Sequence, residues 1–427
     1  MTKKKADENR VLLLSNAAQI VTVSGFEAKK GAQMQELGVI EGGSVLVKGD
    51  RIERILMPGE TLVDIVPDEV IDCTGKTILP GFVDSHTHLV FGGYRENEYN
   101  WRLRGDSYVD IMNRGGGIIN SVRGTREASF EMLYKTGMKR LDSMTRFGVT
   151  TVEAKSGYGL DKETELKQLE VMKALQKDHS LDLVTTFMGA HSVPTEYKGR
   201  GAEFIEYLIA EVMPLVWEQN LAEFCDIFCE KNVFSVEESR RLLTAAKDMG
   251  FKLKLHADEI VQLGGAELAA EVGAVSADHL LQASDEGIRK MAEAGVVATV
   301  LPCTAFSLKE HYARARHMID SGCAVAVATD FNPGSCFTES VPLAIALTTL
   351  QMDMRIEEVI AGLTLNGAAA IGRAHEIGSI DPGKKADLVI HEFPSYQYIP
   401  YHIGVSTVEK VIKNGRLIFD ACKIEIL

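Results

Sequence analysis

The clearest structural signal in this chain is the stretch Leu79-Pro-Gly-Phe-Val-Asp-Ser-His-Thr-His-Leu89. A Pro-Gly turn precedes a short apolar run, which ends in His86 and His88. Residues two apart share one face of a β-strand, so both imidazoles would point the same way. Two histidines on one rigid strand supply half of a tetrahedral site for a borderline divalent ion. A bare His-x-His is equally compatible with histidines that face solvent or pack in a core. Ligand-type residues elsewhere in the chain must therefore decide whether the pair belongs to a metal site.

Apolar runs typical of strands recur between about residues 80 and 370. Counting the first at 82–88 there are eight, the others being 148–153, 183–187, 222–229, 252–256, 274–279, 296–300 and 324–330. Helical patterns lie between them, for example at 164–176, 236–248, 263–272 and 284–294. Eight strands alternating with helices predict an α/β fold, a TIM-like (β/α)8 barrel, whose chemistry lies at the C-terminal ends of the strands.

Short strands punctuated by glycine are predicted on both sides of this barrel. They cover 19–23, 44–48 and 51–56 before it, and 386–391, 408–413 and 416–419 after it, the last two joined by Asn414-Gly415. Such strands predict a small composite β-sandwich domain built from both termini. The expected boundaries are 1–79 for the N-terminal part of the β-rich domain, 80–371 for the barrel and 372–427 for the C-terminal part.

Composition places the chain among water-soluble proteins of the cytoplasm. Its 46 basic and 60 acidic residues give a net charge of −14, which argues against a nucleic-acid binder. No signal peptide is expected at the start, and no apolar run approaches the roughly 18 residues of a membrane span. The seven cysteines include no Cys-x-x-Cys pair, so free thiols in a reducing compartment are expected.

Ligand-type side chains gather at the predicted strand ends. They are His86, His88, His191, Glu230, His256, His279 and Asp330. The other six histidines are predicted to be packing or surface residues, namely His179, His311, His317, His375, His391 and His402. A lone histidine at a strand end is more often structural. Five of them together with a terminal aspartate favour a metal site.

The identity and placement of these residues resemble those of the amidohydrolase superfamily of metal-dependent barrels. Within this superfamily, the chain is most similar to the imidazolonepropionase family. The similarity to imidazolonepropionases is carried by 86–95, 113–118, 153–159, 187–191, 256–259 and 329–335, and it runs nearly end to end. The resemblance implies an enzyme of histidine degradation that acts on a small molecule. It implies a homodimer, and neither nucleic acid nor a membrane is an expected partner.

The resemblance also implies the cofactor and the residues that hold it. In the family one divalent or trivalent metal ion per subunit, Zn²⁺ or Fe, is bound by residues matching His86, His88, His256 and Asp330. Dinuclear relatives often have a carboxylated lysine on strand 4, where this chain has Phe228-Cys-Glu230. One ion is therefore expected, and whether Glu230 contacts it stays open. Sequence alone does not choose between Zn²⁺, Fe and Mn²⁺.

Substrate-binding residues follow from the same resemblance. Those expected to hold 4-imidazolone-5-propanoate are Arg95, Tyr158, His191 and Glu259. Those expected around the product, N-formimidoyl-L-glutamate, are Tyr158, Asn332 and Gly334, with Ser335 beside them. Without the family likeness, Arg95 would be taken for a surface arginine in a charged loop.

The expected reaction is hydrolysis of the imidazolone ring by a metal-activated hydroxide. Asp330 is suited to accept the proton of the water. Glu259 would transfer a proton or hydrogen-bond the ring nitrogens, unless it is a solvated acid at the start of a helix. His279 would stabilise the developing oxyanion or orient a neighbour. Which of the three moves which proton stays open.

Two other functions remain compatible with the residues. One is a different cyclic amidine or aromatic deaminase of the same superfamily. Arg95, Tyr158 and the loop at 332–335 argue against it, because a neutral nucleobase needs no carboxylate anchor. The other is a metal-holding barrel that binds ligands without catalysis. The presence of Glu259 and Asp330 argues against that, because a binder needs no proton shuttle beside the metal.

Overall fold

A computed structural model describes residues 9–63, 65–106, 110–111 and 114–423 of the chain. The start of the chain, where no signal peptide is expected, lies mostly outside these residues. Asn113, which opens one of the stretches that carry the family resemblance, also lies outside them.

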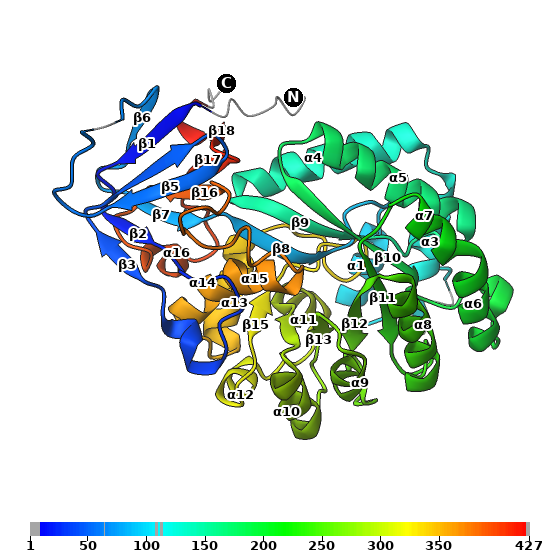
Figure 1. The fold of residues 1–427 in the computed structure, drawn as a ribbon. Coiled ribbons are helices and arrows are strands. Elements are labelled where there is room, and N and C mark those ends of the chain that lie inside the picture. The colour runs from blue at the N-terminus through cyan, green and yellow to red at the C-terminus, as the bar shows by residue number, and fades with distance from the viewer. Residues whose placement is uncertain (1–8, 64, 107–109, 112–113, 424–427) are drawn as a thin grey trace.

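The centre of the molecule is a parallel sheet of eight strands arranged in chain order (Figure 1). They are β8(Phe82–Thr87), β9(Val149–Lys155), β10(Asp182–Ala190), β11(Phe224–Cys229), β12(Lys252–Ala257), β13(Ser276–His279), β14(Val297–Val300) and β15(Val325–Val327). The sheet closes on itself because Asp330 N donates to His86 O at 3.1 Å and His88 N donates to Phe331 O at 2.8 Å. The predicted (β/α)8 barrel is confirmed.

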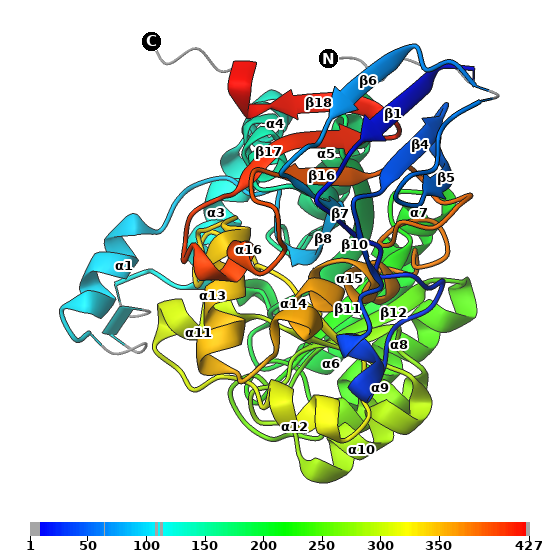
Figure 2. The same cartoon turned by 90° about the vertical axis from the view of Figure 1, so that its left-hand side faces the viewer.

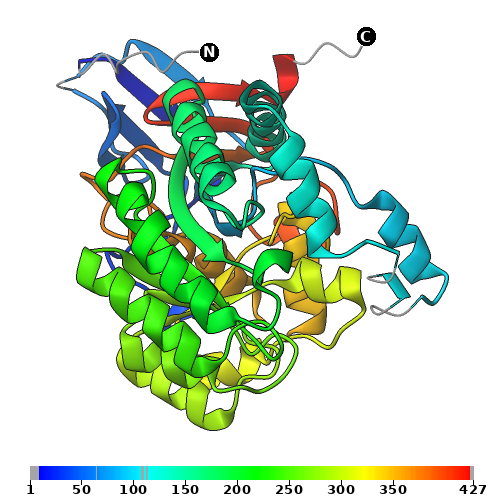
Figure 3. The same cartoon turned by 90° about the vertical axis from the view of Figure 1, so that its right-hand side faces the viewer.

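Most of the helices surround this barrel, as the green and yellow-green ribbons of Figure 3 show, whereas the first of them projects to one side (Figure 2). They are α1(Glu96–Leu103), α3(Ile118–Glu127), α4(Phe130–Arg146), α5(Lys162–Asp178), α6(Gly201–Tyr207), α7(Met213–Glu218), α8(Val236–Met249), α9(Gly265–Val272), α10(Asp285–Ala294), α11(Pro302–Leu308), α12(Ala315–Asp320), α13(Val341–Gln351), α14(Ile356–Leu363) and α15(Leu365–Ala370). Local sequence sets their ends. In α8, Ser235 and Glu238 form a capping box, and Gly250 closes the helix at φ 107°. Across the described ranges, no helix is both long and apolar enough to cross a membrane.

Two further sheets form the outer domain, where blue and red ribbons lie side by side in Figure 2. One contains β5(Arg51–Leu56), β4(Ser44–Lys48), β1(Val11–Ser15) and β6(Glu69–Asp72). The other contains β18(Arg416–Asp420), β17(Val408–Lys413), β16(Leu388–His391), β7(Thr77–Pro80), β2(Gln19–Val21) and β3(Val39–Glu41). Both termini therefore build one β-rich domain, as predicted.

Strand β16 is the link between the two ends of the chain. It pairs antiparallel with β7 on one side and with β17 on the other. Ile78 of β7, Leu388 of β16 and Ile412 of β17 are fully buried in the same core. Since β7 leads through Gly81 directly into β8, the outer domain holds the first barrel strand, and with it His86, in place.

Candidate active site

The four predicted metal ligands converge at the C-terminal mouth of the barrel. His86 lies on β8, His88 follows it, His256 lies on β12 and Asp330 follows β15. One ligand atom each of His86, His88 and Asp330 lie within 4.8 Å of one another. The same holds for His86, His256 and His279. Asp330 Oδ1 is 3.5 Å from His86 Nε2 and 3.8 Å from His88 Nε2. All five side chains are buried.

Two of the histidines are oriented by carboxylates. His86 Nδ1 is 2.7 Å from Asp278 Oδ2, and His256 Nδ1 is 3.0 Å from Asp226 Oδ2. The Nε2 atoms of both histidines are buried without a hydrogen-bond partner. A buried nitrogen without a partner is costly, whereas an imidazole held through Nδ1–H presents Nε2 to a metal. The donor set therefore fits a bound divalent ion.

Sequence reasoning missed the charged residues beneath these histidines. Lys155 Nζ lies 2.8 Å from both Glu153 Oε1 and Asp226 Oδ2, and 3.6 Å from Asp278 Oδ2. Burial lowers the pKa of Lys155, but the charges of Asp226, Glu153 and Asp278 outweigh it and raise the pKa overall. The signal was available, because charged residues inside apolar β-strands are seldom left unpaired.

Asp330 is fixed by a side-chain hydrogen bond and has an unusual backbone conformation. Thr304 Oγ1 donates to Asp330 Oδ2 at 2.6 Å. Burial raises the pKa of Asp330 to about 6, and the Thr304 hydrogen bond opposes that rise. Its φ of 55° is left-handed, as are those of Asp258 (48°), His279 (77°) and Leu280 (61°). Such strained residues collect where the surrounding structure serves a site.

Glu259 faces His279 at the mouth. Glu259 Oε1 lies 3.5 Å from His279 Nδ1, and the Glu259 side chain is 15% exposed. Burial and the negative charge of Asp330 raise the pKa of Glu259 to about 8. Helix α9 begins only at Gly265, so Glu259 lies in a loop and does not open a helix.

Glu230 supports this loop. Its Oε2 accepts from Ile260 N at 2.8 Å, and its Oε1 accepts from Lys231 N at 2.7 Å. Glu230 belongs to neither group of converging ligand atoms among the described residues. Its carboxylate is thus committed to two backbone amides, that of Lys231 next to it and that of Ile260, the residue after Glu259.

Arg95 lies against the loop that follows β15. Its Nε donates to Glu98 Oε2 at 2.8 Å, which fixes the guanidinium. A Cβ added at Gly334 would lie 1.9 Å from Arg95 Nη1. A side chain at position 334 would therefore require the guanidinium to move from its present position.

Asn332 organises the loop that carries Gly334. Its Nδ2 donates to Asp330 O at 2.7 Å and to Ser335 Oγ at 2.9 Å. Its Oδ1 accepts from Gly334 N and Ser335 N, each at 2.8 Å. The Asn332 side chain therefore stabilises the loop of residues 330–335, which lies against Arg95.

Tyr158 and His191, the remaining predicted substrate-binding residues, lie against His88. The His191 ring stacks on His88 with centroids 4.7 Å apart, and Tyr158 lies 5.6 Å from His88. His191 Nδ1 donates to Gly157 O at 3.1 Å. Burial lowers the pKa of His191 to about 3 and raises the pKa of Tyr158, so both side chains are neutral near pH 7.

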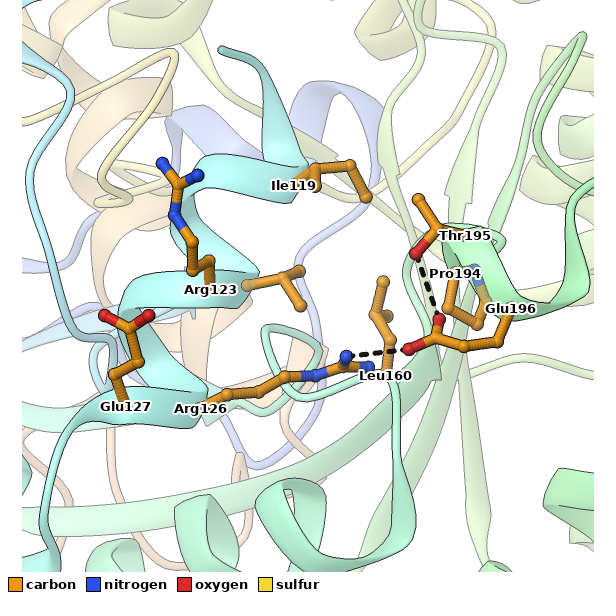
Figure 4. Close-up of a pocket in the computed structure, with 9 residues that line it drawn as sticks. Ile119, Arg123, Arg126, Glu127, Leu160, Pro194, Thr195 and Glu196 are labelled. Carbon is orange, nitrogen blue, oxygen red and sulfur yellow. Dashed lines mark hydrogen bonds and ion pairs between the residues drawn. The ribbon is translucent and has the colours of Figure 1, made fainter. Parts of the chain in front are cut away.

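A separate cavity of 220 Å³ lies between α3 and the segment 194–196 (Figure 4). Arg126 Nη1 crosses it to Glu196 Oε1 at 3.0 Å, as the dashed line shows. Its lining, within the described part of the chain, includes none of the predicted site residues. This cavity is distinct from the converging histidines.

Comparison with known proteins gives a consistent family. The amidohydrolase family matches residues 77–418. An imidazolonepropionase from Clostridium tetani is 62% identical over 414 residues, covering 96% of this chain and 98% of that protein. An imidazolonepropionase from Parabacteroides distasonis is 55% identical over 412 residues, covering 96% and 99%.

Solved structures share the fold at low sequence identity. A zinc-bound adenosine deaminase from Xanthomonas campestris superposes with a TM-score of 0.70 at 19% identity, covering 98% of this chain and 95% of that one. A variant of atrazine chlorohydrolase from Arthrobacter aurescens, complexed with zinc and atraton, gives 0.72 at 15% identity, covering 96% and 95%.

Proposed function

The chain belongs to the amidohydrolase family, among its imidazolonepropionases, and from this we propose that it opens the ring of 4-imidazolone-5-propanoate with water. The product is N-formimidoyl-L-glutamate, and the reaction is a step of histidine degradation. The observation that carries the proposal is the convergence of ligand atoms in two groups that share His86, one with His88 and Asp330 and one with His256 and His279.

His86, His88, His256 and Asp330 would hold one metal ion, Zn²⁺ or Fe. When bound, this ion supplies a water of lowered pKa and polarises the carbonyl group under attack. The unpartnered Nε2 atoms of His86 and His256 support the metal site. The zinc named for two structural neighbours supports a metal in this fold.

The proton transfers fall to Asp330 and Glu259. Asp330, with its pKa raised to about 6, is ionised at neutral pH and able to accept a proton from water. Glu259, with its pKa raised to about 8, is protonated at neutral pH and able to donate to a ring nitrogen. Two carboxyl groups with separated pKa values thus suit opposite roles. His279, 3.5 Å from Glu259, would hydrogen-bond the developing oxyanion.

The propanoate tail would be held by Arg95. A guanidinium can bind a carboxylate through two parallel hydrogen bonds. Tyr158, His191 and Glu259 would surround the ring, and the loop with Asn332, Gly334 and Ser335 would lie beside the product. The closeness of the Arg95 guanidinium to Gly334 supports an anchor that lies beside this loop.

A homodimer in the cytoplasm completes the proposal. The dimer is what the family resemblance implies, and the acidic composition of the chain favours the cytoplasm. Sedimentation velocity of the purified chain is expected to give twice the mass of one subunit, and a monomer at micromolar concentration would contradict the dimer.

A turnover assay separates the three candidate functions. Purified protein is incubated with 4-imidazolone-5-propanoate or with neutral aminated heterocycles, with and without chelator. Formation of N-formimidoyl-L-glutamate that stops after chelation is expected. Release of free ammonia from a heterocycle would favour the deaminase, and binding without turnover would favour a non-catalytic barrel.

A further inference from the structure

Lys155 lies at the end of β9, beneath the converging histidines, and none of the roles proposed above uses it. Its side chain is 0% exposed, and so are those of Glu153, Asp226 and Asp278 around it. A buried ion pair of this kind is a weak source of stability, because desolvation offsets the attraction. Its position therefore calls for a reason other than stability.

The neighbours of Lys155 connect it to two metal ligands. Asp226 accepts from His256 Nδ1 at 3.0 Å, and Asp278 accepts from His86 Nδ1 at 2.7 Å. Lys155 Nζ lies 2.8 Å from Asp226 Oδ2 and 3.6 Å from Asp278 Oδ2. One ammonium group therefore lies within ion-pair distance of both carboxylates that orient the histidines.

Among the described residues, no other lysine or arginine lies within ion-pair distance of both Asp226 and Asp278. Lys254 Nζ is 3.7 Å from Asp278 Oδ2, but it is committed to Ser85 O and Ala370 O at 3.2 Å each. Lys155 is the one lysine or arginine within ion-pair distance of Asp226 in the described part of the chain.

We propose that Lys155 is a positioning residue that sets metal affinity, by holding Asp226 and Asp278 where they orient His256 and His86. The inference rests on the metal site of the proposed function. Without the ammonium group, the buried carboxylates repel one another at short range, since little solvent screens them. They would turn away from the imidazoles, and the Nε2 atoms would no longer converge.

The test measures Zn²⁺ affinity by competition with a chromophoric chelator, independently of turnover. Lys155→Met is expected to bind Zn²⁺ roughly 10- to 100-fold more weakly than wild type, as is usual when the partner of a metal-binding histidine is disturbed. The visible spectrum of the Co²⁺-loaded variant should also change, because it reports ligand geometry.

Lys413→Met is the matched control. Lys413 Nζ is also buried between two carboxylates, 2.8 Å from Asp182 and 2.7 Å from Asp387, but it lies in the outer domain. Its loss should lower Tm as that of Lys155 does and leave the Zn²⁺ affinity and the Co²⁺ spectrum unchanged. Equal losses of affinity in both variants would show a general structural effect and overturn the inference.

The remaining outcomes are also decisive. Lys155→Met with wild-type Zn²⁺ affinity would overturn the inference, whereas wild type that binds no metal would overturn the proposed metal site instead. Should Lys155→Met fail to fold, the variant Lys155→Met/Glu153→Gln removes one buried charge of each sign. The same loss of affinity is expected of it.

Discussion

At the scale of single residues, Asp330 combines the predicted roles of ligand and base. Asp330→Asn keeps a ligand oxygen and the space of the side chain but cannot take up a proton. We expect kcat to fall roughly 10²- to 10⁴-fold, the usual contribution of a positioned base. The measurement is kcat per bound metal, with metal content determined for each preparation. Thr304→Val, which only removes the 2.6 Å hydrogen bond to Asp330, should be milder. Near-normal kcat in Asp330→Asn would rule out its role as the base.

Gly334 determines where the guanidinium of Arg95 can lie. In Gly334→Ala the added methyl carbon would lie 1.9 Å from the present position of Arg95 Nη1. The guanidinium must therefore move. Losing a charge-assisted hydrogen bond to the substrate should raise KM roughly 10- to 100-fold, with kcat less affected.

A double-variant cycle checks that this effect passes through Arg95. Arg95→Ala alone should also raise KM, and Gly334→Ala should add little in the Arg95→Ala background. Additive effects would mean that the methyl group disturbs something other than the guanidinium.

The sequence was informative about residues at strand ends, whereas for the charged residues beneath them it indicated that partners exist without identifying them. His86, His88, His256 and Asp330 could be placed together because parallel strands end at the same mouth. Asp226 and Asp278 could not be assigned, because a single charged residue in an apolar strand does not tell which partner it faces. The roles predicted for the site residues stay predictions until they are measured.

At the scale of elements, the start of α9 depends on Asp258. Its carboxylate accepts four backbone amides, those of Leu263, Gly264, Gly265 and Ala266, at 2.8 to 3.1 Å. Asp258→Ala should lower the free energy of unfolding by roughly 2 kcal/mol, the upper end for loss of a helix cap. Chemical denaturation measures this change.

Ser129→Ala serves as the control for this prediction. Ser129 caps α4 through one exposed hydrogen bond, to Met132 N at 3.2 Å. Its loss should cost no more than about 1 kcal/mol. Equal costs in the two variants would contradict the special weight given to Asp258.

Most barrel elements could be predicted because their apolar runs and caps are local signals. Strand ends were predicted less well. β10 continues to Ala190, three residues beyond its predicted end, and the last strand, predicted to reach Asp330, ends at Val327. The reason is a distant side chain, Asp84, whose carboxylate accepts from Thr329 N at 3.0 Å and from Thr329 Oγ1 at 2.6 Å. A contact with β8 thus replaces the strand ladder. The domain boundaries at 79/80 and 371/372 stay predictions.

At the scale of the whole molecule, His391 makes stability depend on pH. It is buried in β16, with Nδ1 2.8 Å from Thr407 Oγ1, and burial lowers its pKa to about 3. In the unfolded chain the pKa of this histidine is near 6.5, whereas in the folded chain it is about 3. Between these two pH values the unfolded chain binds a proton that the folded chain does not. This contribution to stability is complete above about pH 6.5 and is lost progressively as pH falls toward 3.

His391→Gln should remove this contribution. Between about pH 7.5 and 5, wild type is expected to lose about 2 kcal/mol more stability than the variant. Other titrating groups are common to both proteins and cancel in the difference. Parallel stability–pH curves would show that His391 does not titrate on unfolding.

The place of β16 between β7 and β17 has a consequence for biosynthesis. A ribosome delivers β7 early, together with its partner β2 on one edge, yet its partner on the other edge, β16, emerges only after all eight barrel strands have been translated. Until then β7 presents an open edge and an uncovered apolar face, the features that promote mispairing between nascent chains. Completion of the outer domain thus depends on the last segment to be synthesised, and until then the nascent chain exposes a surface that a chaperone could bind.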